Sequence, residues 1–99
     1  MNKIKIMTMK KVQVRRYEFF PRKNYIIEVE IDETKEDNLS IYINHKEYGT
    51  KLYFCGLSLK DEVLNNESSI IEFCEELIRN NIRLMVDSYE NIIDRMEAV

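Results

Sequence analysis

The chain has 99 residues, of which 44% are apolar and 33% charged, with only two glycines and one proline. This size suits one globular domain over residues 1–99, and so few chain breakers exclude a low-complexity chain or a long flexible linker. No apolar run approaches the length of a membrane span, and the N-terminus lacks the continuous apolar stretch of a signal peptide. We therefore expect a cytoplasmic protein.

Charge is distributed unevenly along the chain. Residues 1–25 carry eight Lys/Arg and one Glu, whereas residues 26–99 carry seven Lys/Arg and seventeen Asp/Glu. The net charge of −3 therefore hides a basic first quarter and an acidic remainder. The two parts either neutralise each other within the fold or face different partners.

Apolar residues alternate with polar ones from Val12 to Leu57, which is the pattern of β-strands. It predicts four strands, over residues 11–19, 25–32, 39–44 and 50–57. Turn residues separate them: Pro21 in the first connection, Asp37-Asn38 in the second and Gly49, able to adopt positive φ, in the third. Such short connections predict an antiparallel meander. Residues 3–9 also alternate and form a fifth strand, an extension of the first, or an arm exchanged between subunits.

Strand register follows from placing the branched aliphatic residues on one face. The aliphatic residues share a face when the numbers of two paired residues sum to 43 in the first strand pair, 72 in the second and 95 in the third. On the other face Arg15 then lies opposite Glu28, Gln13 opposite Glu30 and Lys11 opposite Asp32. The two predicted apolar rows are Val14–Val29–Ile43–Leu52 and Val12–Ile31–Ile41–Phe54.

Helical periodicity replaces the alternation after residue 57. Residues 58–64 predict a short helix, and Ser69 with Glu72 forms a capping-box pattern before apolar residues that recur every three or four positions. A single helix over residues 70–97 would be about 42 Å long, against about 26 Å for an eight-residue strand. We therefore favour a break near Asn80-Asn81, the alternative being one helix whose end projects as an oligomerisation handle. The expected fold is α+β, with the sheet in residues 1–57 and helices in residues 58–99 packed on one face.

Residues that could carry catalysis are scarce. His45, the one histidine, is expected to be solvated in a turn, without a nucleophile, a glycine-rich phosphate loop or metal-ligand spacing around it. Cys55 and Cys74 are nineteen positions apart and are expected to be buried, reduced thiols. We predict a protein that is not an enzyme and uses no cofactor or metal.

The outer face of the sheet carries the most specific surface feature. The predicted registers place Tyr42 beside Tyr53 and surround them with side chains of both charge signs. Tyrosines within a mixed-charge frame are typical of protein interfaces. We predict a protein interface formed by Lys11, Gln13, Arg15, Glu28, Glu30, Tyr42 and Tyr53.

Three functional hypotheses follow. The first is a small inhibitor, immunity or adaptor protein that docks on a larger partner such as a nuclease or defence enzyme, as a phage or bacterial anti-defence protein would, because an acidic surface can occupy a basic groove. The second is a nucleic-acid-binding regulator that uses Lys10, Arg16, Arg22 and Lys23. The third is a homo-oligomer, for example a homodimer, formed through the N-terminal arm or the C-terminal helix.

Overall fold

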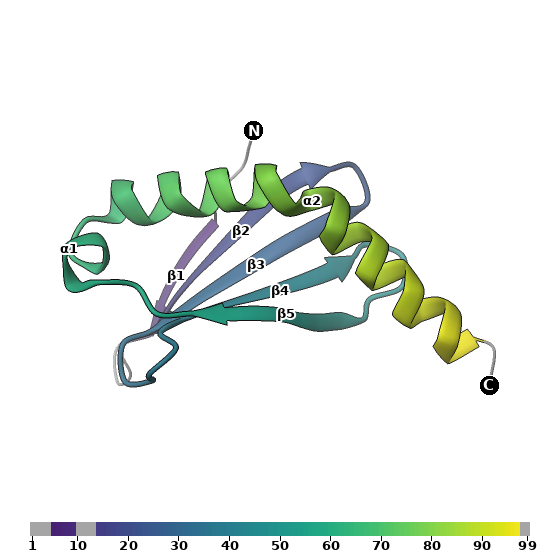
Figure 1. Cartoon of the computed structure of the whole chain (residues 1–99), viewed down its shortest axis with the longest axis horizontal. Helices are drawn as coiled ribbons and strands as arrows, with labels where there is room; N and C mark the ends of the chain where they lie inside the picture. Colours follow the sequence, from purple (N-terminus) through teal and green to yellow (C-terminus); the bar gives the residue numbers. More distant parts are fainter. Residues whose placement is uncertain (1–4, 10–13, 98–99) are drawn as a thin grey trace.

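A five-stranded antiparallel sheet followed by two helices forms the fold (Figure 1). The computed structural model describes the backbone of residues 5–9 and the whole of residues 14–97. The strands lie side by side in chain order, and both helices lie on the same face, which confirms the predicted α+β architecture. The elements are β1 (Lys5–Met9), β2 (Val14–Arg22), β3 (Tyr25–Asp32), β4 (Leu39–His45), β5 (Lys51–Leu57), α1 (Asp61–Leu64) and α2 (Glu67–Glu97).

The sequence left open whether the N-terminal segment forms a strand of its own, and in the structure it forms β1. It pairs antiparallel with β2 and occupies one edge of the sheet. Residues 5–9 are therefore a fifth strand and not an extension of the next one. Lys5 lies opposite Glu18, and Met9 lies opposite Val14.

The predicted register between β2 and β3 is wrong by three residues. Val29 lies opposite Tyr17 instead of Val14, and Glu28 lies opposite Glu18 instead of Arg15. Because three is odd, the shift turns β2 over, so that Tyr17 and its neighbours of the same parity face the helices. This orientation buries Tyr17 and Phe19 completely. Two aromatic rings remove more apolar surface from water than the two valines of the predicted register would.

The registers of β4 differ from the prediction in smaller ways. β3 and β4 are shifted by two residues, which preserves the faces but places Val29 opposite Ile41 and Ile31 opposite Leu39. β4 and β5 keep the predicted register at Ile43–Leu52, and a β-bulge between Ile41 and Tyr42 then places Cys55, not Phe54, opposite Ile41.

Pro21 and Gly49 were each predicted to lie in a turn between two strands. Pro21 lies inside β2 and not in the turn, which is formed by Lys23 and Asn24. The pairing of β2 with β3 is irregular between Phe19 and Arg22, where a residue without an N–H group is tolerated. Gly49 has φ of 69°, as predicted for the turn between β4 and β5.

α2 is one continuous helix of 31 residues, so the predicted break at Asn80-Asn81 is wrong. Ile78 and Met85, on either side of the asparagine pair, are both fully buried against the sheet. Their packing outweighs the weak helix propensity of two asparagines. Asn81 instead donates a hydrogen bond from Nδ2 to the carbonyl of Leu77 (2.8 Å), and α2 bends near its middle and continues past the sheet (Figure 1).

The start of α2 also differs from the prediction. The helix begins at Glu67, and the side-chain oxygen of Asn66 accepts a hydrogen bond from the backbone N–H of Ser69 (3.3 Å). Asn66 is therefore the N-cap, and Ser69 lies inside the first turn. The preceding helix is shorter than predicted, since α1 spans only Asp61–Leu64.

The core lies between α2 and the inner face of the sheet. Inward side chains of β2, β3 and β4 meet one stripe of α2, and nearly all of them are completely buried. The largest fully buried members are Tyr17, Phe19, Ile27, Ile31, Leu39, Ile41, Ile70, Ile78, Met85 and Tyr89.

Replacement of Asn80 tests the continuity of α2. Asn80 is exposed in the middle of the helix, so Asn80→Ala should raise the free energy of unfolding by about 0.5 kcal/mol through helix propensity alone. The matched change Asn66→Ala removes the N-cap and should lower it by about 1 kcal/mol. Urea denaturation measures both, and a neutral or destabilising effect of Asn80→Ala would contradict a continuous helix.

Candidate interaction surfaces

The outer face of the sheet is covered by neither α1 nor α2 (Figure 1). On this face Tyr42 of β4 lies directly opposite Tyr53 of β5, with ring centroids 5.7 Å apart at 67°. Tyr53 is 59% exposed, whereas Tyr42 is half-buried between its neighbours. The predicted adjacency of the two tyrosines is confirmed, and their role in binding stays a prediction.

Charged side chains around the two tyrosines pair with one another across the strands. Arg16 Nε lies 3.2 Å from Glu30 Oε2, and Lys51 Nζ lies 3.7 Å from Glu28 Oε1 and 4.8 Å from the centre of the Tyr42 ring. Such half-exposed pairs contribute little stability each. The sequence predicted that Arg15 lies opposite Glu28 and neutralises it. In the structure Lys51 pairs with Glu28 and Arg16 pairs with Glu30, and Arg15 pairs with neither.

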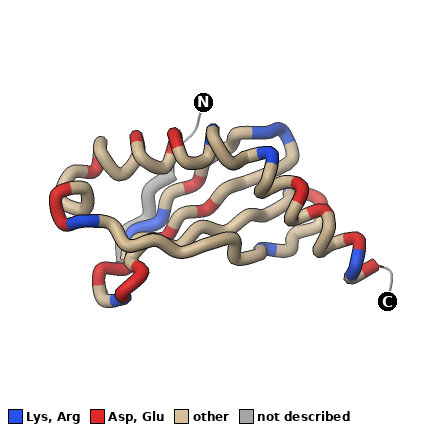
Figure 2. The backbone as a smooth tube through the Cα atoms, in the orientation of Figure 1, with Lys and Arg blue, Asp and Glu red and all other residues tan. Residues whose placement is uncertain are grey.

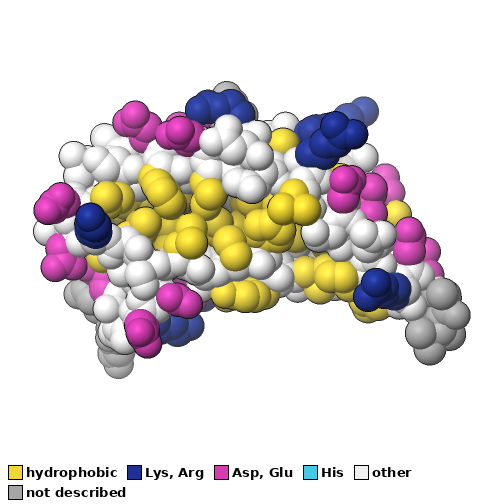
Figure 3. Space-filling model, viewed as in Figure 1, with side chains coloured by type: hydrophobic (Ala, Val, Ile, Leu, Met, Phe, Trp, Pro, Cys, Tyr) yellow, Lys and Arg dark blue, Asp and Glu magenta, His cyan; other side chains and the backbone are white. Residues whose placement is uncertain are grey.

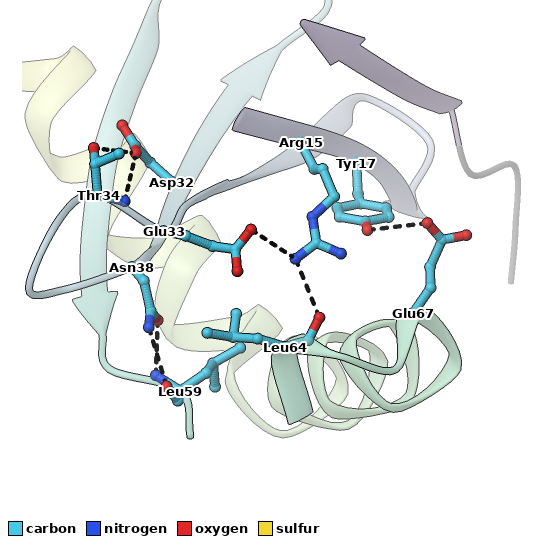
Figure 4. A network of polar contacts seen from close by, with 9 residues as sticks. All are labelled: Arg15, Tyr17, Asp32, Glu33, Thr34, Asn38, Leu59, Leu64 and Glu67. Carbon is cyan, nitrogen blue, oxygen red and sulfur yellow. Dashed lines mark hydrogen bonds and ion pairs between the residues drawn. The ribbon is translucent and has the colours of Figure 1, made fainter. Parts of the chain in front are cut away.

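Arg15 lies on the inner face, so its assignment to the outer interface was wrong. The reversed orientation of β2 directs it toward the end of α1, where Nη2 donates to the carbonyl of Leu64 (3.2 Å) and lies 3.9 Å from Glu33 Oε2 (Figure 4). Arg15 thus satisfies a carbonyl group at the end of a helix. Lys11 and Gln13, the other predicted interface residues on this strand, lie outside the described residues.

Further polar contacts tie the helical region to the same end of the sheet (Figure 4). Tyr17 donates to Glu67 Oε2 (3.4 Å), and its pKa is raised, chiefly by burial, against the lowering effect of Arg15 and with a further rise from Glu67. Asn38 exchanges two hydrogen bonds with the backbone of Leu59, at 3.0 and 2.8 Å. These contacts fix the start of α2 and the segment before α1 relative to the strands.

The residues predicted to contact nucleic acid do not gather into one strip within the described part of the chain. Arg16 is paired with Glu30, and the side chains of Glu18 and Glu28 lie in the same shallow hollow. Arg22 and Lys23 are exposed at the turn between β2 and β3. Lys10 lies outside the described residues.

His45 is buried, so the expectation of a solvated turn histidine was wrong. It is the last residue of β4, is 6% exposed, and accepts a hydrogen bond at Nδ1 from the N–H of Glu47 (3.1 Å). Its ring packs edge-on against Tyr25 (4.8 Å between centroids) and stacks on Tyr48 (4.4 Å). The signal in the sequence was its parity, because Leu39, Ile41 and Ile43 share the inward face with it.

The aromatic cluster of Tyr25, His45, Tyr48 and Tyr89 anchors the second half of α2. The hydroxyl of Tyr25 donates to Glu90 Oε2 (3.0 Å), and the hydroxyl of Tyr89 donates to the carbonyl of Thr50 (2.7 Å). Burial, followed by the hydrogen bond to Glu90, raises the pKa of Tyr25 to about 12. The cluster therefore has a structural role at the end of the sheet opposite to Arg15.

An apolar opening along β5 was missed at the level of sequence. None of the seven residues of β5 is fully buried, although Leu52, Phe54, Cys55 and Leu57 all pack against the core. The signal was the unbroken run LYFC, which gives this strand apolar side chains on both faces. An edge strand with two apolar faces is unusual for a surface exposed to water.

Two features that would indicate other functions are missing from the described ranges. Residues 14–97 hold no group of three or more His, Cys, Asp or Glu side chains placed to bind a metal ion. No helix in the described part of the chain is long and apolar enough to cross a bilayer. Cys74 is buried and Cys55 half-buried, and both are free thiols.

Comparisons of the chain with protein-family models, curated proteins and solved structures found no match.

Replacement of Tyr25 tests the aromatic anchor. Tyr25→Phe should lower the free energy of unfolding by about 1 kcal/mol at neutral pH, because it removes the bond to Glu90. A folded-state pKa of about 12 lies above the value near 10 of an unfolded tyrosine. The protonated hydroxyl of Tyr25 thus contributes stability that is complete below about pH 10 and is lost as the pH rises toward 12.

Denaturation from pH 8 to pH 12 should therefore show the wild type approaching the Tyr25→Phe variant as the pH rises. Tyr53→Phe, at an exposed position, is the matched control and should follow the wild type throughout. A constant difference between the wild type and Tyr25→Phe would contradict the ionisation part of this prediction.

Proposed function

We propose that this chain is a non-enzymatic protein-interaction module that docks on a larger partner through the outer face of its sheet. The observation that carries the proposal is the Tyr42–Tyr53 pair on a face that no described helix covers. Tyrosines bury a large area at low entropic cost and are enriched among residues that dominate binding energy.

The surroundings of the pair support the same role. Lys51–Glu28 and Arg16–Glu30 present both charge signs around the rings, as the polar rim of an interface does. All four charged residues project from strands of one sheet, so their positions are fixed before binding. A preorganised surface loses little conformational entropy when the partner docks.

The class of partner is inferred from charge. Residues 26–99 carry ten more acidic than basic side chains, and an acidic protein can block a basic groove by competition. We place the protein among inhibitors, immunity proteins and adaptors, with a nuclease or defence enzyme as the partner, as in a phage or bacterial anti-defence protein. The free thiols of Cys55 and Cys74 fit a cytoplasmic location.

Self-association is a second candidate function. Ile92 is 41% exposed and Met96 is 56% exposed, and both lie in the C-terminal part of α2. An exposed apolar helix end can pack against a second copy. Light scattering at high protein concentration tests this candidate, and a strict monomer would exclude it.

A double substitution tests the proposed docking face. Tyr42→Ala with Tyr53→Ala should weaken partner binding by about 100-fold or more, while the free energy of unfolding changes by about 1 kcal/mol or less. The partner is captured from the native host, purified, and its affinity for each variant is measured by calorimetry.

Tyr48→Ala is the matched control, because Tyr48 is 51% exposed but lies at the turn beside His45. It should bind like the wild type. Full binding by a folded double variant would remove this face from consideration. Nucleic-acid affinity that falls steeply with salt would instead favour the nucleic-acid hypothesis.

A further inference from the structure

α2 crosses the sheet obliquely and leaves one corner of its inner face open. Its first turn lies beside β2, where Tyr17 bonds to Glu67, and Tyr89 near its other end bonds to Thr50, the residue before β5. The first half of α2 is therefore displaced from β5. Figure 3 shows apolar side chains along this opening, in a band between α2 and β5.

One flank of α2 provides the upper wall of the opening. Val86 borders Arg22 of β2, so its flank faces the β2 side of the sheet. Leu77 precedes Val86 by nine residues, which at about 100° per residue places it on the opposite flank, toward β5. Phe73 and Leu84 share that flank with Leu77 and form a stripe about 17 Å long. Leu84 is 57% exposed.

β5 provides the lower wall. Its inward side chains remain only half-buried, whereas those of the adjacent β4 are almost completely buried. A β-bulge interrupts its pairing with β4, and such irregularity disfavours the addition of another strand at this edge. The opening therefore suits side chains inserted from a helix better than a strand that extends the sheet.

The rim of the opening carries more acidic than basic side chains. Figure 2 shows carboxylate residues on α1, along the first half of α2 and in the loop between β3 and β4. Within residues 14–97, none of these rim carboxylates has a Lys or Arg nitrogen within 4 Å, unlike Glu28 and Glu30 on the outer face. The rim carboxylates are Glu36, Asp37, Asp61, Glu62, Glu72 and Glu76, and the lysines among them are Lys35 in the same loop and Lys60 directly before α1.

From this arrangement we infer that the α2–β5 opening binds a basic amphipathic helix of another protein. Large apolar side chains of that helix insert between Phe73, Leu77 and Leu57, and flanking Lys or Arg residues face the carboxylates of the rim. A second copy of this chain fits poorly, because a two-fold contact through this opening would place two acidic rims against each other. This surface is separate from the outer sheet face and does not depend on the function proposed for it.

Two synthetic peptides test the inference. One is an amphipathic helix of leucine and lysine, and the other has the same leucine pattern with glutamate in place of lysine. Fluorescence anisotropy should show binding of the lysine peptide at least about tenfold tighter than the glutamate peptide, with the difference reduced at high salt.

Variants locate the binding to the opening. Glu72→Lys with Glu76→Lys changes only exposed side chains, so the fold is retained, and it should reverse the preference between the two peptides. Phe73→Ser should weaken both peptides by about tenfold or more. Ile92→Ser, an exposed apolar position farther along the same helix, is the matched control and should leave both affinities unchanged.

Three outcomes would overturn the inference. The first is equal binding of the two peptides, and the second is a preference that the Glu72/Glu76 reversal leaves unchanged. The third is a dimer in light scattering that dissociates in the Phe73→Ser variant, because a second copy would then be the occupant of the opening.

Discussion

One helix has to cover the inner face of five strands. Adjacent strands lie about 4.8 Å apart, so the sheet is about 19 Å wide from β1 to β5. A helix with its side chains is only about 10 Å across. α2 lies closest to β2 and β3, and its coverage is full where their inward apolar residues are almost completely buried, at Tyr17, Phe19, Ile27, Val29 and Ile31. The half-buried side chains of β5 follow directly from this mismatch in width.

The same mismatch explains why α2 is fixed at both ends by polar contacts. Its buried stripe alone would allow the helix to slide or rotate over a broad apolar face. Tyr17 holds one end through the carboxylate of Glu67, and Arg15 holds the adjoining α1 through the carbonyl of Leu64. At the other end Tyr25 bonds to Glu90 and Tyr89 bonds to the carbonyl of Thr50. These contacts join residues far apart in sequence and select one crossing direction.

The sequence predicted element types and faces better than pairings. Period-two alternation placed Val29, Ile31, Ile41 and Ile43 on the inner face correctly, but a two-residue shift keeps every face and so cannot be detected from alternation. β2 was more ambiguous, because both of its faces carry apolar or aromatic side chains. The outcome there depended on the burial of two aromatic rings, which is a property of the assembled core.

Tyr42 and Tyr53 were found because they lie near the turn at Gly49, where a short connection fixes the register. The bulge enters farther from the turn, and the prediction for Phe54 fails there. The continuity of α2 could not be read from Asn80 and Asn81, since packing on both sides of them decides it. The run LYFC marked β5 as apolar on both faces, but the opening beside it also depends on the angle at which the helix crosses the sheet, which alternation does not encode.

The order of the elements has a consequence for biosynthesis. The whole sheet is encoded before residue 58, and the helix that covers it follows. At about 5–20 residues per second, the ribosome needs roughly 2–8 s to make residues 58–97. During that interval the nascent chain carries a bare apolar surface that α2 later shields. Completion of α2, and not the formation of the hairpins, therefore sets the moment at which this surface becomes safe from aggregation.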